Sequence, residues 1–396
     1  MNLSGKLNLL LLTHPVGLDS TSMPRFANFI RRGMVERGHN VNVVTSPAIL
    51  SRNRNTNCGL GKWLNYIDQF LLFPPRLASM IRRLRADTLI VVVDQALGML
   101  VHEVAHRPHV IHCHDFLALR SARGEVPEKT TSVTGKQYQR WIQHGFNHGK
   151  NFISVSQRTQ NDLHRFLKHP PQLSEVVYNG LNGPFRQLND TEAKGLLSEQ
   201  LTPRDDEGFL LHVGGNQWYK NRLGVVAIYA EYCKLVKQPM PLWMIGSKPN
   251  DKLLQAAAAV SDNGSVRFLT GLNDEQVIAA YNLASLFLFP SLDEGFGWPI
   301  AEAMACGTRV VTTQAAPMTE VGGDAAYYVP RGSGSDASWA AGAAKTVAAA
   351  LSESAESVAK RIECSLEQSE KFNSDQTLDR YEEIYRRVLK NAGFGG

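Results

Sequence analysis

Two glutamates, Glu294 and Glu302, flank a short turn that is rich in glycine and aromatic residues. The apolar run before the turn predicts a strand, and Pro299 stands in the first turn of a predicted helix, where proline is tolerated. The turn consists of Gly295, Phe296, Gly297 and Trp298. Backbone N–H groups at the start of a helix and the positive end of its dipole form an anion site that suits a diphosphate. The alternative is that Glu294 only stabilises the helix start and that Glu302 is a surface residue.

The stretch from Glu294 to Gly307 resembles the Glu-x7-Glu signature of the retaining glycosyltransferases of family 4, which have the GT-B fold. Trp298 replaces the small or aliphatic residue that is usual there. The resemblance implies that Glu294 contacts the donor sugar and that Glu302 binds the ribose hydroxyls. It also implies that the backbone amides around the turn hold sugar hydroxyls and phosphate. The expected donor-binding residues of the turn are therefore Gly295, Phe296, Gly297 and Trp298.

A second segment, residues 212–222, resembles the loop in which this family places an arginine and a lysine. A departing diphosphate develops negative charge, which fixed cations must stabilise. Lys220 falls on the lysine, whereas Gly215 stands at the arginine position, and we expect Arg222 to supply the second charge. The alternative is a strand-to-helix loop with ordinary solvated charges. Family members also contact the base with backbone groups, in the segment that here contains Thr270 and Leu272.

The N-terminal half offers further candidates. His114 ends a predicted strand, and the resemblance implies that a histidine here approaches the donor sugar near the anomeric carbon, with His112 as the alternate. A histidine packed in the wall of a cleft is the other interpretation. A metal site that combines these histidines with Cys113 is not expected, because alternate strand residues point to opposite faces. Family members carry a Gly-Gly loop after the first strand, against the donor phosphate or the acceptor, and here only Gly17 is present.

Short apolar runs alternate with helical stretches along the chain, which predicts parallel sheets covered by helices. The predicted strands are 9–12, 41–45, 88–93, 109–112, 152–155, 209–212, 241–245, 266–268, 286–289 and 309–312. We therefore predict an α/β protein with two tandem Rossmann-like, doubly wound domains that face a cleft, as in GT-B. The expected parts are an acceptor-binding domain at 1–185, a linker at 186–206, a nucleotide-sugar-binding domain at 207–375 and a helix at 376–396 that packs back on the N-terminal domain.

The composition is that of a globular protein, since 43% of the 396 residues are hydrophobic and 20% are charged. No apolar run approaches the roughly 18 residues that span a bilayer, and no signal-peptide cleavage site follows the first apolar run. The five scattered cysteines indicate a reducing compartment. Residues 1–200 carry 24 basic and 14 acidic side chains, which suggests an anionic partner, with uneven charge of no function as the alternative.

Aromatic and aliphatic residues between Trp63 and Arg85 stand beside a cluster of arginines. Such a segment would suit docking on anionic lipid, although a core-packed helix with a solvated arginine face is the favoured interpretation. We expect a cytoplasmic protein without a nucleic-acid partner, and peripheral contact with the inner face of the membrane stays open.

These observations predict a hexosyltransferase that moves a sugar from a UDP- or GDP-linked donor to a hydroxyl of a glycan or lipid-linked glycan, with retention. The donor is a substrate, and no cofactor is expected. No Asp-x-Asp motif occurs, so no metal is expected either. Two alternatives stay open: another enzyme on the same fold, such as a nucleotide-sugar epimerase, and a non-catalytic sugar-nucleotide-binding protein, for which Gly215 is the main argument.

Overall fold

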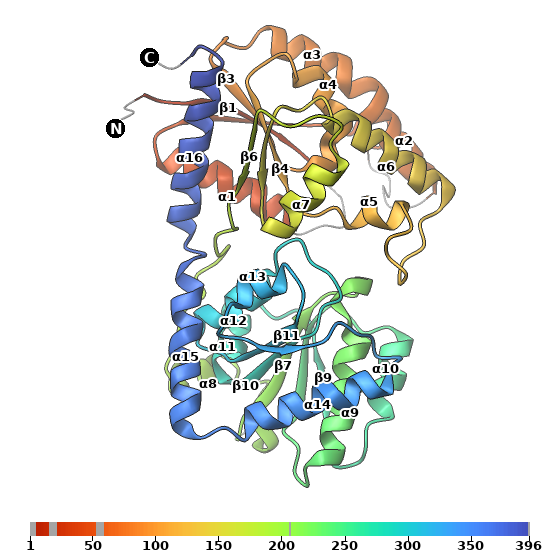
Figure 1. The fold of residues 1–396 in the computed structure, drawn as a ribbon, viewed down its shortest axis with the longest axis vertical. Helices are drawn as coiled ribbons and strands as arrows, with labels where there is room; N and C mark the ends of the chain where they lie inside the picture. Colours follow the sequence, from red (N-terminus) through yellow and green to blue (C-terminus); the bar gives the residue numbers. More distant parts are fainter. Residues whose placement is uncertain (1–4, 16–21, 53–58, 206, 395–396) are drawn as a thin grey trace. The chain divides into compact units, whose positions relative to one another are not determined.

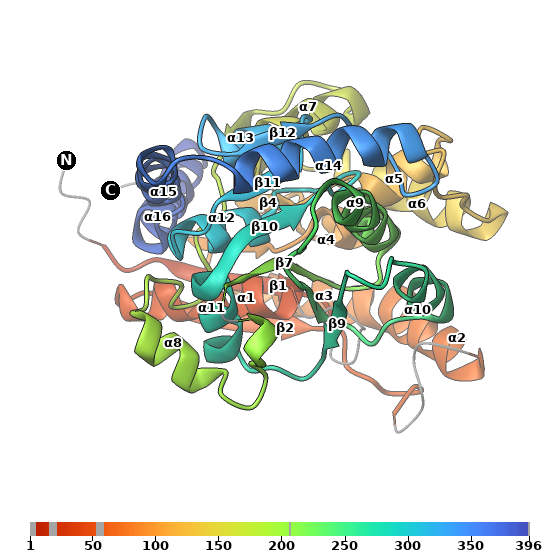
Figure 2. The same ribbon diagram turned by 90° about the horizontal axis from the view of Figure 1, so that it is seen from below.

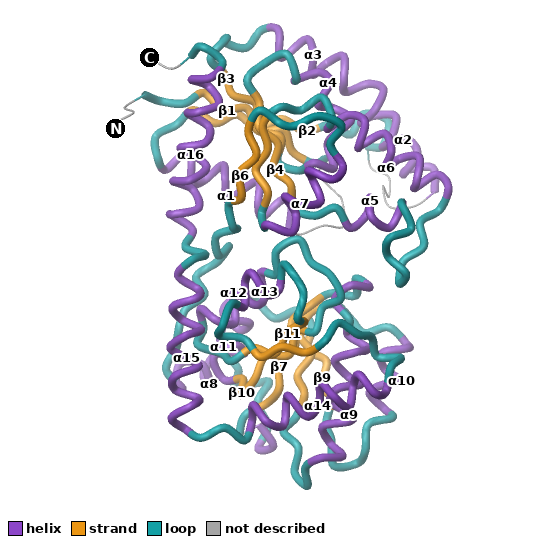
Figure 3. The backbone as a smooth tube through the Cα atoms, in the orientation of Figure 1, coloured by secondary structure: helices purple, strands orange, loops and turns teal. Residues whose placement is uncertain are grey.

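The structure, a computed structural model, describes residues 5–15, 22–52, 59–205 and 207–394. The chain forms two compact units: unit 1 comprises Met1–Asn182 with Ser374–Gly396, and unit 2 comprises Gly183–Asn373. Each unit contains a six-stranded sheet whose strands all pair in parallel, with helices packed around it (Figures 1 and 3). The predicted α/β class with two doubly wound domains is confirmed.

The sheet of unit 1 has the strand order β2-β1-β3-β4-β5-β6. Its strands are β1 (Asn8–Thr13), β2 (Asn40–Thr45), β3 (Thr88–Val92), β4 (His109–Cys113), β5 (Asn151–Ser154) and β6 (Leu173–Val176). Strands β3, β4 and β5 are buried along their whole length, as expected for central strands with helices on both faces. The strand order reverses between β1 and β3, and parallel α/β sheets bind ligands at the carboxyl ends of the strands beside such a switch point.

Helix α16 (Ser374–Asn391) at the C-terminus is part of unit 1 and packs on α1 (Ser22–Glu36), as Figure 1 shows. Its apolar stripe is buried: Leu378, Tyr381, Ile384, Tyr385 and Val388. The two helices approach closely at Gly33, where an added Cβ would lie 2.3 Å from Leu378 Cδ1. The other helices of unit 1 are α2 (Gly59–Ile67), a π-helical turn (Asp68–Leu72), α3 (Phe73–Arg82), a 3-10 helix (Gln95–Leu100), α4 (Val101–Val104), α5 (Leu117–Ala122), α6 (Val133–Phe146) and α7 (Gln157–Phe166).

The sheet of unit 2 has the order β12-β11-β10-β7-β8-β9, which is the Rossmann order with its switch point between β7 and β10. Its strands are β7 (Phe209–Gly214), β8 (Leu242–Gly246), β9 (Val266–Leu269), β10 (Ala284–Phe289), β11 (Val310–Thr313) and β12 (Tyr327–Val329). Its longer helices are α9 (Arg222–Leu235), α10 (Asp251–Ala258), α11 (Asp274–Leu283), α12 (Trp298–Ala305), α14 (Ala337–Leu351) and α15 (Ala355–Glu370). Helices α9 and α14 lie side by side (Figure 2). Tyr229 on α9 and Trp339 and Val347 on α14 belong to one buried cluster.

The region 186–206, predicted to be a linker, is instead part of unit 2. It contains helix α8 (Asp190–Leu196), which begins with an Asn189 cap and packs on α11 (Figure 2). Ala193 and Leu197 are fully buried, and Asp205 accepts a hydrogen bond of 2.8 Å from Trp243 Nε1. The linker prediction was wrong because the segment is mostly polar. Its few apolar residues form no periodic pattern from which the helix could be recognised.

None of the helices in the described part of the chain is both long enough and apolar enough to cross a membrane. Among the described cysteines, Cys113, Cys233, Cys306 and Cys364 are free thiols, and Cys58 lies outside the described residues.

Candidate active site

The predicted donor-binding residues of unit 2 gather at its switch point. Strands β7 and β10 are neighbours in the sheet, and the loops at their carboxyl ends lead into α9 and α12. Two hydrogen bonds connect these loops. The backbone N of Leu292 donates to Tyr219 O at 2.8 Å, and the side-chain Nδ2 of Asn221 donates to Pro290 O at 2.9 Å. The loops therefore form one connected structure.

The loop after β10 ends at Gly297, which has a φ of 104° and stands directly before α12. A residue with a side chain would be strained in this left-handed conformation, so glycine is required there. Helix α12 then starts with Trp298 and Pro299, and it has no side-chain cap at its first residue. The predicted strand, glycine turn and proline-started helix are confirmed as structural elements.

The functional groups of Lys220 and Glu294 meet as an ion pair, with Nζ 2.8 Å from Oε1. The same carboxylate oxygen accepts a hydrogen bond of 2.8 Å from Ser291 Oγ. The side chains are only 14% and 8% exposed, and Nζ lies 5.0 Å from the centre of the Phe289 ring. Limited contact with water strengthens the pair and holds both groups in fixed positions.

Two residues of this region were missed from the sequence. Asn221 has a φ of 52°, and its side chain donates to Pro290 O and, at 3.0 Å, to Gly332 O, so it joins the two loops and a third segment. Ser291 stands three residues before Glu294 and holds its carboxylate. Asn221 stands in the N-cap position of α9, but its side chain makes no capping hydrogen bond, and its partners are far away in the sequence.

Arg222 is the first residue of α9. Its Nη1 donates to Ser247 O at 2.9 Å and to the side chain of Asn216. Its Nε and Nη2 are buried and have no hydrogen-bond partner among the described residues. Burial lowers the pKa of this guanidinium from its ordinary value. Two buried donors without partners point to a missing acceptor, and a diphosphate or a nucleoside oxygen would supply one.

His212 lies fully buried on β7, with Nδ1 2.9 Å from Leu288 O. Burial lowers its pKa to about 3, the contact with Leu288 O opposes this change, and the charges of Arg222 and Lys220 lower the pKa further. His212 is therefore neutral near pH 7, and it adds no third positive charge to this site.

The remaining donor-binding candidates of unit 2 are spread around the carboxyl edge. Glu302 on α12 accepts a hydrogen bond of 3.1 Å from the hydroxyl of Tyr281 on α11. Thr270 is exposed and Leu272 is half-buried, and both lie between β9 and α11. Their roles stay predictions.

In unit 1, His114 follows β4 and packs edge-on against Phe26, with 4.3 Å between the ring centres. Its Nε2 lies 2.9 Å from Val93 O, and burial is the main reason that its pKa is lowered. His112 is a core residue instead: its Nε2 lies 2.9 Å from Tyr385 OH on α16. Both histidines are buried, and the role of His114 near the donor sugar stays a prediction. Gly17 lies outside the described residues.

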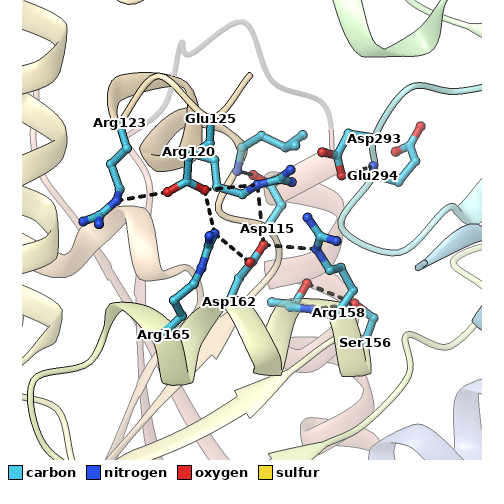
Figure 4. Close-up of polar contacts among 12 residues, drawn as sticks. Asp115, Arg120, Arg123, Glu125, Ser156, Arg158, Asp162, Arg165, Asp293 and Glu294 are labelled. Atoms are coloured by element: carbon cyan, nitrogen blue, oxygen red, sulfur yellow. Dashed lines mark hydrogen bonds and ion pairs between the residues drawn. The ribbon is translucent and has the colours of Figure 1, made fainter. Parts of the chain in front are cut away.

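The sequence did not predict a network of charged side chains that lies in the segments following β4 and β5 (Figure 4). Asp162 on α7 is its centre: Arg158 Nε lies 3.3 Å and Arg165 Nη2 lies 3.0 Å from its carboxylate. Glu125 pairs with Arg165 at 2.8 Å and with Arg123 at 3.1 Å. These guanidinium groups are paired within unit 1, which fixes the segment after α5 to α7. Among the described residues, no group of three His, Cys, Asp or Glu side chains could hold a metal ion.

Two family models match the chain. The model of the glycosyl transferases group 1 matches residues 194–367, and the model of glycosyltransferase family 4 matches residues 24–182. The two matches lie in unit 2 and unit 1, respectively. The chain is a glycosyltransferase, because each of its two units matches a glycosyltransferase family model.

Curated relatives of this glycosyltransferase include two proteins of Escherichia coli. The chain is 27% identical to O-antigen chain mannosyltransferase B over 178 residues, which are 44% of the chain and 46% of the relative. It is 42% identical to the serotype-specific mannosyltransferase WbdA over 180 residues, which are 44% of the chain and 22% of the relative. The chain thus matches less than half of the length of each relative.

Solved structures share the fold of this glycosyltransferase over nearly the whole chain. A glycosyltransferase from Rickettsia africae superimposes with a TM-score of 0.66 at 16% identity, over 98% of this chain and 100% of that one. Anabaena HepE in complex with UDP and glucose superimposes with a TM-score of 0.69 at 17% identity, over 95% and 98%. The predicted GT-B fold is confirmed. The matches to glycosyltransferases do not favour the epimerase alternative.

Proposed function

We propose that this chain is a retaining, metal-independent hexosyltransferase that takes a mannosyl group from a nucleoside diphosphate donor and passes it to a hydroxyl of a carbohydrate acceptor. The observation that carries the proposal is the Lys220–Glu294 pair, held beside the glycine turn that opens α12. The names of the curated relatives support mannose as the sugar. Unit 2 binds the donor, and unit 1 binds the acceptor.

The ion pair prepares both groups for the donor. A diphosphate carries more negative charge than one carboxylate, so it competes for the ammonium group of Lys220. Glu294 is then free to accept hydrogen bonds from hydroxyls of the sugar. The unpartnered Nε and Nη2 of Arg222 give two further donors for the nucleotide. Glu302 with the ribose, and Thr270 and Leu272 with the base, complete the proposed donor contacts.

The reaction breaks the bond between the anomeric carbon and the diphosphate oxygen. The acceptor oxygen forms the new bond on the same face of the sugar, and its proton passes to the departing phosphate oxygen. The fixed ammonium of Lys220 and the start of α12 stabilise the charge that develops on the diphosphate. We assign to His114 a contact with the sugar near the anomeric carbon.

A donor panel tests this function. Release of nucleoside diphosphate is measured with GDP-mannose, UDP-glucose and UDP-N-acetylglucosamine, each with and without a mannoside acceptor. We expect turnover with GDP-mannose that depends on the acceptor, and strong loss in Lys220→Ala. Lys252→Ala is the matched control, because Lys252 is an exposed lysine on α10 of the same unit. Donor binding without any turnover would instead support a non-catalytic binding protein.

A peripheral contact with an anionic membrane has support of its own in unit 1. Trp63 is 64% exposed and Leu71 is 68% exposed, and ring contacts link Trp63 through Tyr66 and Phe70 to Trp141 on α6. The adjacent α3 buries one face in the core and exposes Arg76 and Arg82, as the core-packed alternative predicted. Apolar and aromatic side chains beside cations suit the interface of an anionic membrane.

Cosedimentation with vesicles tests the membrane contact. We expect the chain to pellet with vesicles that contain phosphatidylglycerol and to stay in solution with pure phosphatidylcholine. Replacement of both Trp63 and Leu71 by serine should abolish the association. Equal binding of this variant would show that another surface, or no specific one, is responsible.

A further inference from the structure

The switch point of unit 1 contains an ion pair of its own, which the mechanism above does not use. His14 directly follows β1, and Asp94 follows β3 two residues after its end. His14 Nε2 lies 2.8 Å from Asp94 Oδ2, and the side chains are 17% and 10% exposed. The pair therefore joins the two loops at the position where parallel α/β sheets bind ligands.

Both members of the pair are held by further hydrogen bonds. Asp94 Oδ1 accepts a hydrogen bond of 2.8 Å from Ala96 N, so both carboxylate oxygens are engaged. Thr45 Oγ1, at the end of β2, donates to the carbonyl oxygen of His14 at 2.8 Å. Three neighbouring strands thus fix the pair from their carboxyl ends. Such rigid support is typical of groups that orient a ligand.

The partner of His14 determines which of its ring nitrogens carries the proton. Burial alone would raise the pKa of Asp94, but the hydrogen bond and the charge of His14, the charge of His114 and the amide of Ala96 bring it below its ordinary value. An ionised carboxylate only accepts hydrogen bonds, so Nε2 of His14 is the protonated nitrogen. Nδ1 has no hydrogen-bond partner among the described residues, and the side chain of His14 is 17% exposed. Nδ1 is thus the ring nitrogen that we expect to face a ligand.

We propose that His14 Nδ1 forms a hydrogen bond with a hydroxyl of the acceptor sugar, and that the His14–Asp94 pair orients the acceptor in unit 1. This inference rests on the proposed function. A hydroxyl group can donate to a ring nitrogen or accept from it, whereas a histidine paired with an ionised carboxylate offers an anion no net positive charge. The expected ligand is therefore an uncharged carbohydrate hydroxyl and not a phosphate.

Kinetics with two substrates tests the proposal. The full chain is assayed with the donor that the panel identifies and with methyl α-D-mannopyranoside as the acceptor probe. We expect His14→Ala to raise the acceptor KM about tenfold while the donor KM changes less than about twofold. His106→Ala, which changes an exposed histidine of the same unit, is the control. An unchanged acceptor KM, or an equal rise of both KM values, would overturn the proposal.

A second variant covers the case in which His14→Ala does not fold, as judged by circular dichroism. Asp94→Asn keeps the size of the side chain but removes the negative charge that holds the ring of His14. It should raise the acceptor KM with normal affinity for the free nucleoside diphosphate. Normal acceptor KM in Asp94→Asn would contradict the role of the pair. Absence of any turnover in the unmodified chain would instead contradict the proposed function.

Discussion

Each of the two units has an ion pair at the same topological position, but the residue types of the two pairs differ. In unit 2, Lys220 and Glu294 join the loops after β7 and β10, with 2.8 Å between Nζ and Oε1. In unit 1, His14 and Asp94 join the loops after β1 and β3, also at 2.8 Å. Each pair spans the point where its strand order reverses. A switch point collects loops from strands that are distant in sequence, so it is where a parallel sheet can assemble a site.

The difference between the pairs matches the ligands that we propose for them. Lysine keeps its charge near neutral pH and suits a diphosphate, whereas a histidine that is backed by a carboxylate suits a neutral hydroxyl. Unit 2 adds the start of α12 and the unpartnered nitrogens of Arg222. The comparison predicts that changes in unit 2 act on the donor and that changes in unit 1 act on the acceptor.

The largest effect is expected from loss of the cation in unit 2. Lys220→Ala removes a fixed donor at the point where charge develops, so turnover should fall by about 100- to 1,000-fold. Glu294→Gln should also lower turnover strongly, because the sugar hydroxyls lose a charged acceptor. Release of nucleoside diphosphate is the measurement. Full turnover in Lys220→Ala would contradict the assignment of the donor diphosphate to unit 2.

Ligand binding should protect one unit more than the other. A nucleoside diphosphate at 100 times its Kd stabilises the folded state by about 2.7 kcal/mol. Hydrogen–deuterium exchange should then slow in residues 214–222 and 290–298 of unit 2. Residues 93–96 of unit 1 serve as the internal comparison and should change little. Protection centred on unit 1 would reverse the assignment of donor and acceptor.

Acid should destabilise unit 1 more than unit 2. Burial lowers the pKa of His109, His112 and His114 in unit 1, and it lowers the pKa of His212 in unit 2 to about 3. A histidine with a lowered pKa contributes its full stability above the unfolded value of about 6.5 and loses it as the pH falls toward the folded value. Each such histidine can cost up to about 2 kcal/mol between about pH 7 and pH 5.

Hydrogen exchange at the two pH values, corrected for the intrinsic rate, measures this difference. Protection of β4 in unit 1 should fall more than protection of β7 in unit 2. The same loss in both strands would mean that the buried histidines do not set the acid stability.

The smallest effect is expected at the C-terminal helix. Tyr385→Phe removes the hydroxyl that lies 2.9 Å from His112 Nε2, and both residues are fully buried. The free energy of unfolding should fall by about 1 kcal/mol, because a buried nitrogen loses its partner. Denaturant unfolding measures the change, and donor turnover should remain normal. A loss of donor turnover would connect α16 with the chemistry of unit 2, which the comparison does not predict.

The sequence predicted the strand, turn and helix around Glu294 well because these elements are contiguous. Strand β10, the glycine turn and α12 are contiguous, and the demands of a left-handed Gly297 and a proline in the first helical turn can be recognised in the sequence. Short elements were missed, such as β6, β12 and α8. Their formation depends on neighbours in the tertiary structure and not on a periodic pattern.

The ion pairs could not be predicted, because their members are far apart in the chain. His14 and Asp94 are 80 residues apart, and Lys220 and Glu294 are 74 residues apart. The sequence identified Lys220 and Glu294 separately and gave no sign that their side chains meet. It gave no reason to select His14 or Asp94, since a single histidine or aspartate after a strand is common. Strand order brings these residues together, and it follows from the packing of both sheets.

A crystal structure of the chain with GDP-mannose tests the central claim most directly. The account predicts that the diphosphate lies at the start of α12, within hydrogen-bond distance of Lys220 Nζ and of backbone amides between Gly295 and Trp298. Glu294 should then contact the mannosyl group instead of Lys220. A diphosphate bound at any other place, with the Lys220–Glu294 pair intact, would contradict the account.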